Sequence, residues 1–268
     1  MWEIMQILKY SPKGINSLLD LGMGKGQISE YFANKGIKVT GTGLELKSYE
    51  VDPEDWEKRG IQVVECGIEC MPFENGSFDA VVASHILEHV SNMGTALQEI
   101  RRVLTPKGWL MIFIPHFSGY STAGHINTGW NIGQLLYVLL LNGFDVKEGH
   151  FLRSKNSVCA FVQKSNQELP PLRGDRGDIQ ILNDGDYLPF KIIPSNSGDR
   201  DSYNGEIQSI NWDHAEELLR QLEQHRSTKG MIINKLAKII VKIIGVRNAN
   251  LFSDEICRVG GQVNPKFL

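Results

Sequence analysis

The amino-acid sequence predicts an α/β protein with a doubly wound, mostly parallel sheet of seven strands. Short apolar runs alternate with helical patterns from Ser17 to Lys164, which is the order typical of such sheets. The first five runs are apolar almost throughout, as expected of parallel strands that helices cover on both faces. A glycine-rich turn follows the first run. These observations place the first five strands in the centre of the fold.

Each expected element has its own signal in the sequence. The predicted strands are "SLLDLG" (17–22), "KVTGTG" (38–43), "IQVVEC" (61–66), "FDAVVASH" (78–85), "GWLMIFIPH" (108–116), "FDVKEGHF" (144–151) and "SVCAFVQK" (157–164). The last two follow each other closely, so we expect a hairpin at one edge of the sheet. The predicted helices are Gln27 to Lys35, which Gly36 ends, Met93 to Leu104, which stops before Pro106, and Ile132 to Leu141, which ends at Asn142.

The composition changes near Ser165 and divides the chain into residues 1–164 and a C-terminal extension, residues 165–268. The start of the extension is rich in Pro, Gly, Asp and Asn and is expected to be a linker or an irregular segment. Two helices are predicted beyond it, Asp213 to His225 and Lys229 to Ile244. The second is amphipathic with a row of lysines, and three roles stay open: packing on the protein's own core, a homodimer contact, or binding to an anionic membrane surface.

The overall composition narrows the possible partners and the compartment. A formal net charge of -3 gives no basic footprint, so no nucleic-acid partner is expected. The four cysteines form neither CxxC pairs nor a dense framework, which favours reduced, mostly buried thiols in a cytoplasmic protein. We also expect no signal peptide, and no apolar run approaches the ~20 residues needed to cross a bilayer.

The turn after the first strand contains Gly22, Gly24 and Gly26. Glycines in this place allow positive φ angles and let a ligand approach the backbone, while the next helix offers its first amides to an anion. The spacing differs from the GxxxxGK[ST] pattern of a P-loop. It also differs from the dinucleotide pattern GxGxxG, because Gln27 occupies the position of the third glycine.

Asp20 precedes these glycines and completes the pattern D-x-G-x-G-x-G, which resembles that of class I S-adenosylmethionine-dependent methyltransferases. The resemblance continues through three further stretches in the order found in the small-molecule branch of this family. These are "CMPFENGSFDAVVASHILEHV" (70–90), "ALQEIRRVLTPKGWLMIFIP" (96–115) and "LLYVLLLNGFDV" (135–146). The resemblance therefore implies a Rossmann-like methyltransferase fold in residues 1–164 and S-adenosylmethionine as the cofactor.

The resemblance also implies which residues hold the cofactor. Asp20 and the backbone of the glycine turn would hold its methionyl end. The candidate cofactor-binding residues are Asp20, Gly22, Met23, Gly24, Gly26, Glu45, Ile68, Glu69 and His85.

Two positions depart from the family pattern. Gly43 falls where an acidic residue normally accepts hydrogen bonds from the two ribose hydroxyls, and Gly67 falls where a second acidic residue stands near the adenine. Glu45 lies two residues beyond Gly43 and is our candidate replacement for the ribose carboxylate. A lost charge-assisted hydrogen bond costs about 1.5–3 kcal/mol, so these glycines predict weaker cofactor binding.

Histidines at strand ends are the candidates for acceptor chemistry. His116 and His125 are predicted as general bases, because a neutral imidazole removes a proton near neutral pH, although an ordinary loop role stays open for both. The loop from His116 to Trp130 is either a lid or surface decoration. Glu88 and His89 are interpreted as a structural pair at a helix start. The histidines are not at zinc-ligand spacing, so the sequence predicts no metal site.

The leading hypothesis is a methyltransferase that modifies O or N of a small molecule, such as a sugar or a secondary metabolite. Gly43 and Gly67 favour an alternative, a non-catalytic scaffold or partner subunit with the same fold. The helix predicted at Lys229 to Ile244 motivates a third hypothesis, a peripheral membrane enzyme that acts on a lipid-linked saccharide.

Overall fold

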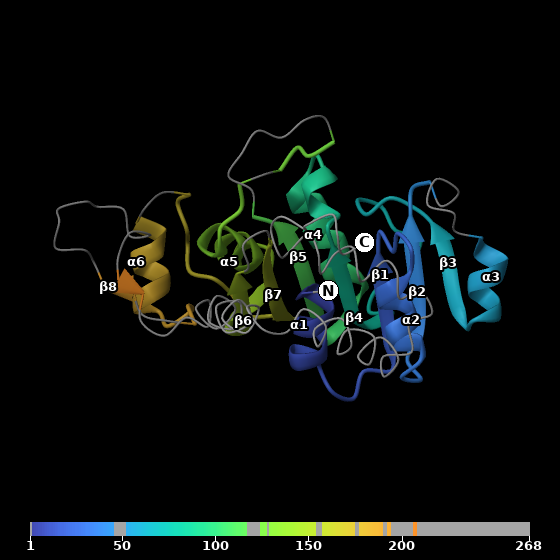
Figure 1. The fold of residues 1–268 in the computed structure, drawn as a ribbon. Coiled ribbons are helices and arrows are strands. Elements are labelled where there is room, and N and C mark those ends of the chain that lie inside the picture. The colour runs from blue at the N-terminus through green and yellow to red at the C-terminus, as the bar shows by residue number, and fades with distance from the viewer. Residues whose placement is uncertain are drawn as a thin grey trace, which may run out of the picture.

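The computed structural model of the 268-residue chain describes residues 2–45, 52–116, 124–127, 129–153, 157–174, 177–189, 192–193 and 206–207. Its centre is a seven-stranded sheet with the strand order β3-β2-β1-β4-β5-β7-β6 (Figure 1). The strands are β1 (Ser17–Leu21), β2 (Lys38–Gly43), β3 (Ile61–Glu65), β4 (Phe78–Ser84), β5 (Leu104–Pro115), β6 (Phe144–Arg153) and β7 (Ser157–Lys164). A separate two-stranded sheet pairs β8 (Ile192–Ile193) with β9 (Glu206–Ile207).

The main sheet has the predicted mixture of directions. Its first five strands in spatial order pair in parallel, whereas β7 is antiparallel to both β5 and β6. The expected hairpin of the last two strands therefore lies at one edge, with β6 outermost. The predicted fold class, a doubly wound and mostly parallel seven-stranded sheet, is confirmed.

Helices cover both faces of the sheet. The helices are α1 (Trp2–Tyr10), α2 (Gln27–Ala33), α3 (Pro53–Lys58), α4 (Met93–Val103), α5 (Ile132–Leu141) and α6 (Gly177–Asp184), with a short 3₁₀ helix, η2 (Leu87–His89). Alternate residues of the central strands enter two separate apolar clusters: Leu18 packs with residues of α1, α2 and α3, whereas Leu19 packs with residues of α4, α5 and α6. This two-sided burial is the physical reason for the continuous apolar runs in the sequence.

The boundary between α4 and β5 differs from the prediction. The sequence pattern extended the helix to Leu104, but α4 ends at Val103 and β5 begins at Leu104. Leu104 is fully buried and pairs with Phe78, and the strand register shifts before Ala80 pairs with Trp109. A cross-strand pair thus outweighs the helical pattern at this position.

The prediction of a linker or irregular segment from Ser165 onward was wrong for residues 177–184, which form α6. Ile179 and Leu182 of α6 are buried in the same cluster as α5. The Asp178 carboxylate accepts the backbone N–H groups of Arg173 and Gly174, both at 2.7 Å, and the Tyr137 hydroxyl at 3.0 Å. Figure 1 shows α6 beside α5. A few buried contacts therefore dock a segment whose composition is that of a loop.

The structure does not test the other predictions for residues 165–268. The boundary between residues 164 and 165 stays a prediction, and the predicted helices at 213–225 and 229–244 lie outside the described residues. Within the described part of the chain, no helix combines the length and the apolar character that crossing a bilayer requires.

The thiols differ in burial more than expected. Among the described cysteines, Cys159 is buried, Cys66 is half-buried and Cys70 is exposed, and all three are free. The expectation of mostly buried thiols was therefore wrong for the described part of the chain.

Because α6 packs on the core, two substitutions in this helix should change the free energy of unfolding by different amounts. Leu182→Ala should lower the free energy of unfolding by about 2–5 kcal/mol, because it empties a fully buried site. Gln180→Ala, at an exposed position of the same helix, should change it by no more than about 0.5 kcal/mol. Urea unfolding followed by circular dichroism measures both, and an unchanged Leu182→Ala variant would show that α6 does not contribute to the core.

Candidate cofactor and acceptor site

The glycine turn lies at the carboxyl end of β1, where the strand order reverses between β1 and β4. Ligands of open α/β sheets bind at such a switch point. Gly22, Gly24 and Gly26 have φ angles of 63°, 50° and 71°, a region that L side chains rarely adopt. The residues that the sequence singled out for a tight turn thus form one.

The three glycines face different surroundings. A Cβ atom on Gly26 would lie 2.3 Å from the Trp56 ring, and one on Gly22 would lie 2.8 Å from Ile86 Cδ1. A Cβ atom on Gly24 would meet only the Gly22 carbonyl oxygen, at 3.9 Å. Gly22 and Gly26 are therefore required by packing, whereas Gly24 borders open space that a ligand can occupy.

Asp20 is a buried carboxyl group next to this turn. It is 2% exposed, and the Ser29 hydroxyl donates a hydrogen bond of 2.7 Å to its Oδ2. Burial raises the pKa of Asp20 to about 6, although the hydrogen bonds from Ser29 act in the opposite direction. A buried carboxylate with one polar partner is suited to receive a cationic group from a ligand.

Met23 contributes differently from its glycine neighbours. Its side chain is buried against Gly41 of β2, where an added Cβ atom would lie 2.3 Å from the Met23 sulfur. Its backbone N–H donates a hydrogen bond of 2.8 Å to Thr42 O. Met23 therefore ties the turn to β2, and its role toward the cofactor stays a prediction.

The ends of β2 and β3 carry the two departures from the family pattern. Gly43 pairs with Glu65, and its carbonyl oxygen accepts the Cys66 N–H at 3.1 Å. Leu44 is 70% exposed and lies 3.5 Å from the Cβ position of Gly67. Glu45 comes next in the chain and its side chain is exposed. Its role at the ribose stays a prediction.

Ile68 and Glu69 lie in the segment after β3. Ile68 is half-buried and packs against the apolar cluster that contains the buried residues of α4. Glu69 is exposed, and its Oε1 accepts the backbone N–H of Asn92, the N-cap residue of α4, at 3.1 Å. Both contacts are structural, and the predicted cofactor contacts of these residues stay predictions.

His85 follows β4 with a φ angle of 54°, and its backbone N–H donates to Phe113 O at 2.9 Å. Its Nε2 lies 3.4 Å from a carboxylate oxygen of Glu3 in α1, and its Nδ1 lies 3.4 Å from Glu88 Oε1. Desolvation lowers the pKa of His85, but the hydrogen bonds with the two carboxylates outweigh it and raise the pKa to about 9. His85 therefore links α1 to η2, and cofactor binding by its ring stays a prediction.

His116 directly follows Pro115, the last residue of β5, and is half-buried. Its Nδ1 lies 2.6 Å from the backbone carbonyl oxygen of Trp130. A carbonyl oxygen can only accept a hydrogen bond, so Nδ1 carries the proton and the neutral ring keeps the lone pair of Nε2. This tautomer is the one that a general base at Nε2 requires, and catalysis by His116 stays a prediction.

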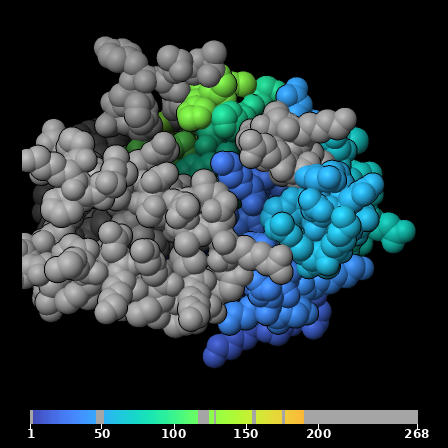
Figure 2. Space-filling view, turned by 45° about the vertical axis from the view of Figure 1, so that its right-hand side comes forward, coloured from blue at the N-terminus to red at the C-terminus, as the bar shows by residue number. Residues whose placement is uncertain are grey.

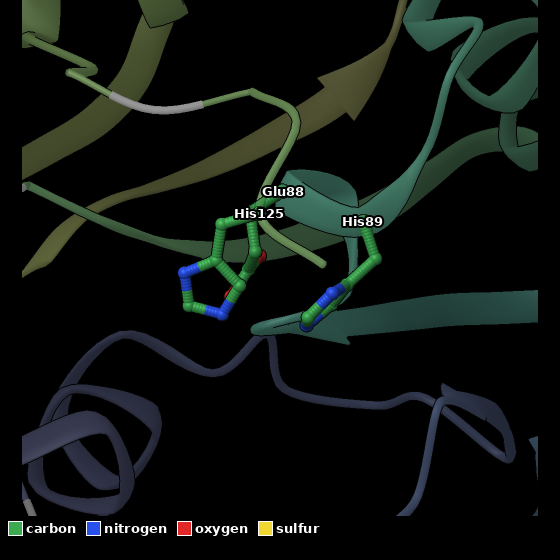
Figure 3. A group of neighbouring side chains, drawn as sticks. All are labelled: Glu88, His89 and His125. Carbon is green, nitrogen blue, oxygen red and sulfur yellow. The ribbon is translucent and has the colours of Figure 1, made fainter. Parts of the chain in front are cut away.

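His125 lies beside η2, in the segment that follows β5. The rings of His89 and His125 have centroids 4.8 Å apart at an angle of 75°. Figure 3 shows both rings on the same side of η2, with Glu88 next to them, and one ligand atom from each of the three residues lies within 4.8 Å of the others. The sequence does not indicate this pairing, because His89 lies in η2 and His125 lies in a loop beyond the next strand, β5.

Comparison with known proteins names the family that this fold and turn define. The profile of a family described as a methyltransferase domain matches residues 19–112. A ubiquinone biosynthesis O-methyltransferase of Paracidovorax citrulli is 35% identical over 186 residues, which cover 68% of this chain and 71% of that protein. The chain belongs to the class I S-adenosylmethionine-dependent methyltransferases, so the resemblance and its cofactor, S-adenosylmethionine, are confirmed.

Other relatives share shorter regions. A sterol 4-C-methyltransferase of Caenorhabditis elegans is 31% identical over 99 residues, which cover 35% of this chain and only 30% of that protein. The structure of a phosphoethanolamine N-methyltransferase of Haemonchus contortus, solved with S-adenosylmethionine, matches with a TM-score of 0.51 at 17% identity and covers 62% of this chain and 52% of that one. These proteins modify different acceptors, so the family and fold do not specify the substrate.

Because Asp20 is buried, we expect its ionisation to lower the free energy of unfolding of the cofactor-free protein, by an amount that depends on pH. Its pKa rises from 3.8 to about 6 on folding, so the folded state binds the proton more tightly than the unfolded state does. Stability is thus lost as the pH rises from about 4 through 6. Asp20→Asn removes this titration and should be more stable than wild type by about 2–3 kcal/mol at pH 8, with a smaller advantage at pH 5.

Urea unfolding of both proteins at pH 5 and pH 8, without cofactor, measures this difference. An advantage of Asp20→Asn that stays constant between the two pH values would contradict the raised pKa.

Proposed function

We propose that this protein transfers a methyl group from S-adenosylmethionine to a hydroxyl oxygen of a small molecule in the cytoplasm. The observation that carries the proposal is the open space at Gly24 beside the buried carboxyl of Asp20, at the switch point of the sheet. This combination leaves room for a ligand and provides a counter-charge for its amino group.

The described residues fit the methionyl end of the cofactor. The carboxyl of Asp20 would face the amino group, and the backbone at Gly24 can be approached closely because no side chain projects there. The first amides of α2 follow this turn and favour a carboxylate by roughly 0.3–1 kcal/mol through the helix dipole. Holding reactants in the correct orientation can supply on the order of 7–11 kcal/mol of the barrier.

When bound, the cofactor supplies a methyl carbon that an acceptor oxygen can attack while the carbon–sulfur electron pair returns to the sulfonium sulfur. The protein then has to remove the proton of the acceptor hydroxyl. We assign this step to Nε2 of His116, because the hydrogen bond to Trp130 O keeps the proton on Nδ1.

The choice of oxygen as the acceptor atom rests on the relative from Paracidovorax citrulli, which is an O-methyltransferase by name. Within that class, a sugar or a secondary metabolite is our candidate. Transfer to nitrogen is the alternative within the same fold. A non-catalytic scaffold or partner subunit is the alternative from another class, and Gly43 and Gly67 are the positions that favour it.

A pair of glycine substitutions tests the cofactor site. Gly24 and Gly36 both have positive φ angles, 50° and 80°, and Gly36 lies beyond α2 with nothing within 4 Å of its Cβ position. Alanine at either position should cost about 1–2 kcal/mol of backbone strain. Only Gly24→Ala should also weaken the binding of S-adenosylhomocysteine, by at least about tenfold, or about 1.4 kcal/mol.

Calorimetric titration of wild type and both variants with S-adenosylhomocysteine measures the affinities, and thermal unfolding measures the shared strain. Equal affinities in Gly24→Ala and Gly36→Ala would reject the site. Absence of binding to wild type would reject the enzyme and favour the scaffold.

Substitution of His116 tests the proton-removal step. Once a panel of hydroxylated sugars and aromatic compounds has identified an acceptor, His116→Gln should lower kcat about 10²- to 10⁴-fold with little change in KM. His150→Gln is the control, because His150 lies in β6 with its ring against Tyr10. A kcat that is unchanged in His116→Gln would exclude His116 as the base.

A further inference from the structure

The group formed by Glu88, His89 and His125 has the composition of a metal site. Each residue places one potential ligand atom within 4.8 Å of the other two. Two imidazoles and one carboxylate are the protein ligands of many zinc enzymes and of non-haem iron sites. The donors around a bound ion of this kind lie about 3.4 Å apart, so the ligand atoms, which lie within 4.8 Å of one another, need to approach by up to about 1.4 Å, and the two histidines are exposed.

The carboxylate of Glu88 provides an independent indication of a ligand. Glu88 is 1% exposed, and its Oε1 lies 3.4 Å from His85 Nδ1. Within the described part of the chain, its buried Oε2 receives no hydrogen bond. Buried carboxylate oxygens without a partner are costly and rare, and those that persist are typically paired or coordinate a metal.

The surrounding backbone orients the two histidines as ligands. His89 Nδ1 lies 2.5 Å from Gly124 O, so Nδ1 donates its proton and leaves the lone pair of Nε2 for an ion. Metal-binding histidines typically donate their second ring N–H to a carbonyl or carboxylate in this way. The tautomer of His89 is therefore set by a contact with the segment that carries His125.

That segment is itself fastened to η2. The backbone N–H groups of Ile126 and Asn127 donate to Glu88 O at 2.7 and 3.1 Å, and Asn127 Nδ2 donates to Val90 O at 2.5 Å. In Figure 2 the described residues of this loop (lime green) lie next to the blue-green segment that contains η2. These bonds hold His125 next to His89 without any contribution from the imidazole rings.

We propose that Glu88, His89 and His125 bind a divalent first-row transition-metal ion, such as Zn²⁺ or Mn²⁺. Three protein ligands leave further coordination positions of the ion open, as in catalytic rather than structural sites. This donor set favours such ions over Mg²⁺ and Ca²⁺, which take mainly oxygen ligands. The absence of zinc-ligand spacing in the sequence does not argue against this site, because the fold creates it.

The position of the site connects it to methyl transfer, and this part of the inference rests on the proposed function. Ile86 precedes η2 and lies against Gly22. The proposed metal site and the glycine turn therefore lie at the same end of the sheet, the carboxyl ends of the parallel strands. An acceptor hydroxyl that takes an open position on the ion has a lower pKa, so its O–H bond breaks more readily. The electron pair stays on the oxygen, and the proton passes to Nε2 of His116.

Metal titration of the full-length protein tests the site without any acceptor. Protein stripped with a chelator is titrated with Zn²⁺ or Mn²⁺ by calorimetry, and with Co²⁺ while the visible absorption of the bound ion is followed. We expect one equivalent to bind to wild type and to His150→Gln. Loss of a hydrogen bond to a metal ligand weakens metal binding by about 10- to 100-fold. His125→Gln and Glu88→Gln each remove a ligand itself, so each should weaken metal binding by more than this.

Two results would overturn the proposal: a wild-type dissociation constant for all three ions above about 1 mM, or equal affinities in His125→Gln and His150→Gln. His125 is exposed, so His125→Gln decides the question even if Glu88→Gln does not fold. Binding of S-adenosylhomocysteine to the chelated protein is measured separately, so a failed metal site is distinguished from a failed cofactor site.

Discussion

Burial of the central strands on both faces is the constraint on which the rest of the structure depends. Leu18 and Leu19 enter opposite apolar clusters, and the same alternation continues through β4 and β5. With both faces covered by helices, polar groups can reach a ligand only from the ends of the strands. The glycine turn after β1, His85 after β4 and His116 after β5 all follow from this restriction.

Two buried carboxyl groups lie near these strand ends, and their surroundings differ. Asp20 accepts hydrogen bonds from the hydroxyl and the backbone of Ser29, and burial raises its pKa. Glu88 lies between His85 on one side and His89 with His125 on the other. Each arrangement is costly in the free protein, where buried charge is poorly solvated, and each is relieved by a cation. Buried carboxyl groups with few partners recur at sites that bind cationic ligands.

The central sheet and the glycine turn were predictable from the sequence because their signals are local. Continuous apolar runs indicate strands covered on both faces, and three glycines after a strand indicate a tight turn. The α6 helix was not predictable, since its docking depends on Ile179, Leu182 and the hydrogen bonds of Asp178 within a stretch of loop-like composition. The group of Glu88, His89 and His125 was missed for a related reason. The segment that carries His125 is held at η2 by the backbone N–H groups of Ile126 and Asn127, which donate to Glu88 O, and such bonds leave no pattern in the sequence.

The attachment of the His125 segment to η2 affects how this protein can change over evolutionary time. Ile126 is held by its backbone N–H, while its side chain is 63% exposed. Because the anchor is made largely of main-chain atoms, the exposed side chain can be replaced without releasing the segment. An enzyme built in this way can change what its loop presents to an acceptor and still keep the neighbouring histidine in place, which separates the evolution of specificity from the maintenance of the site.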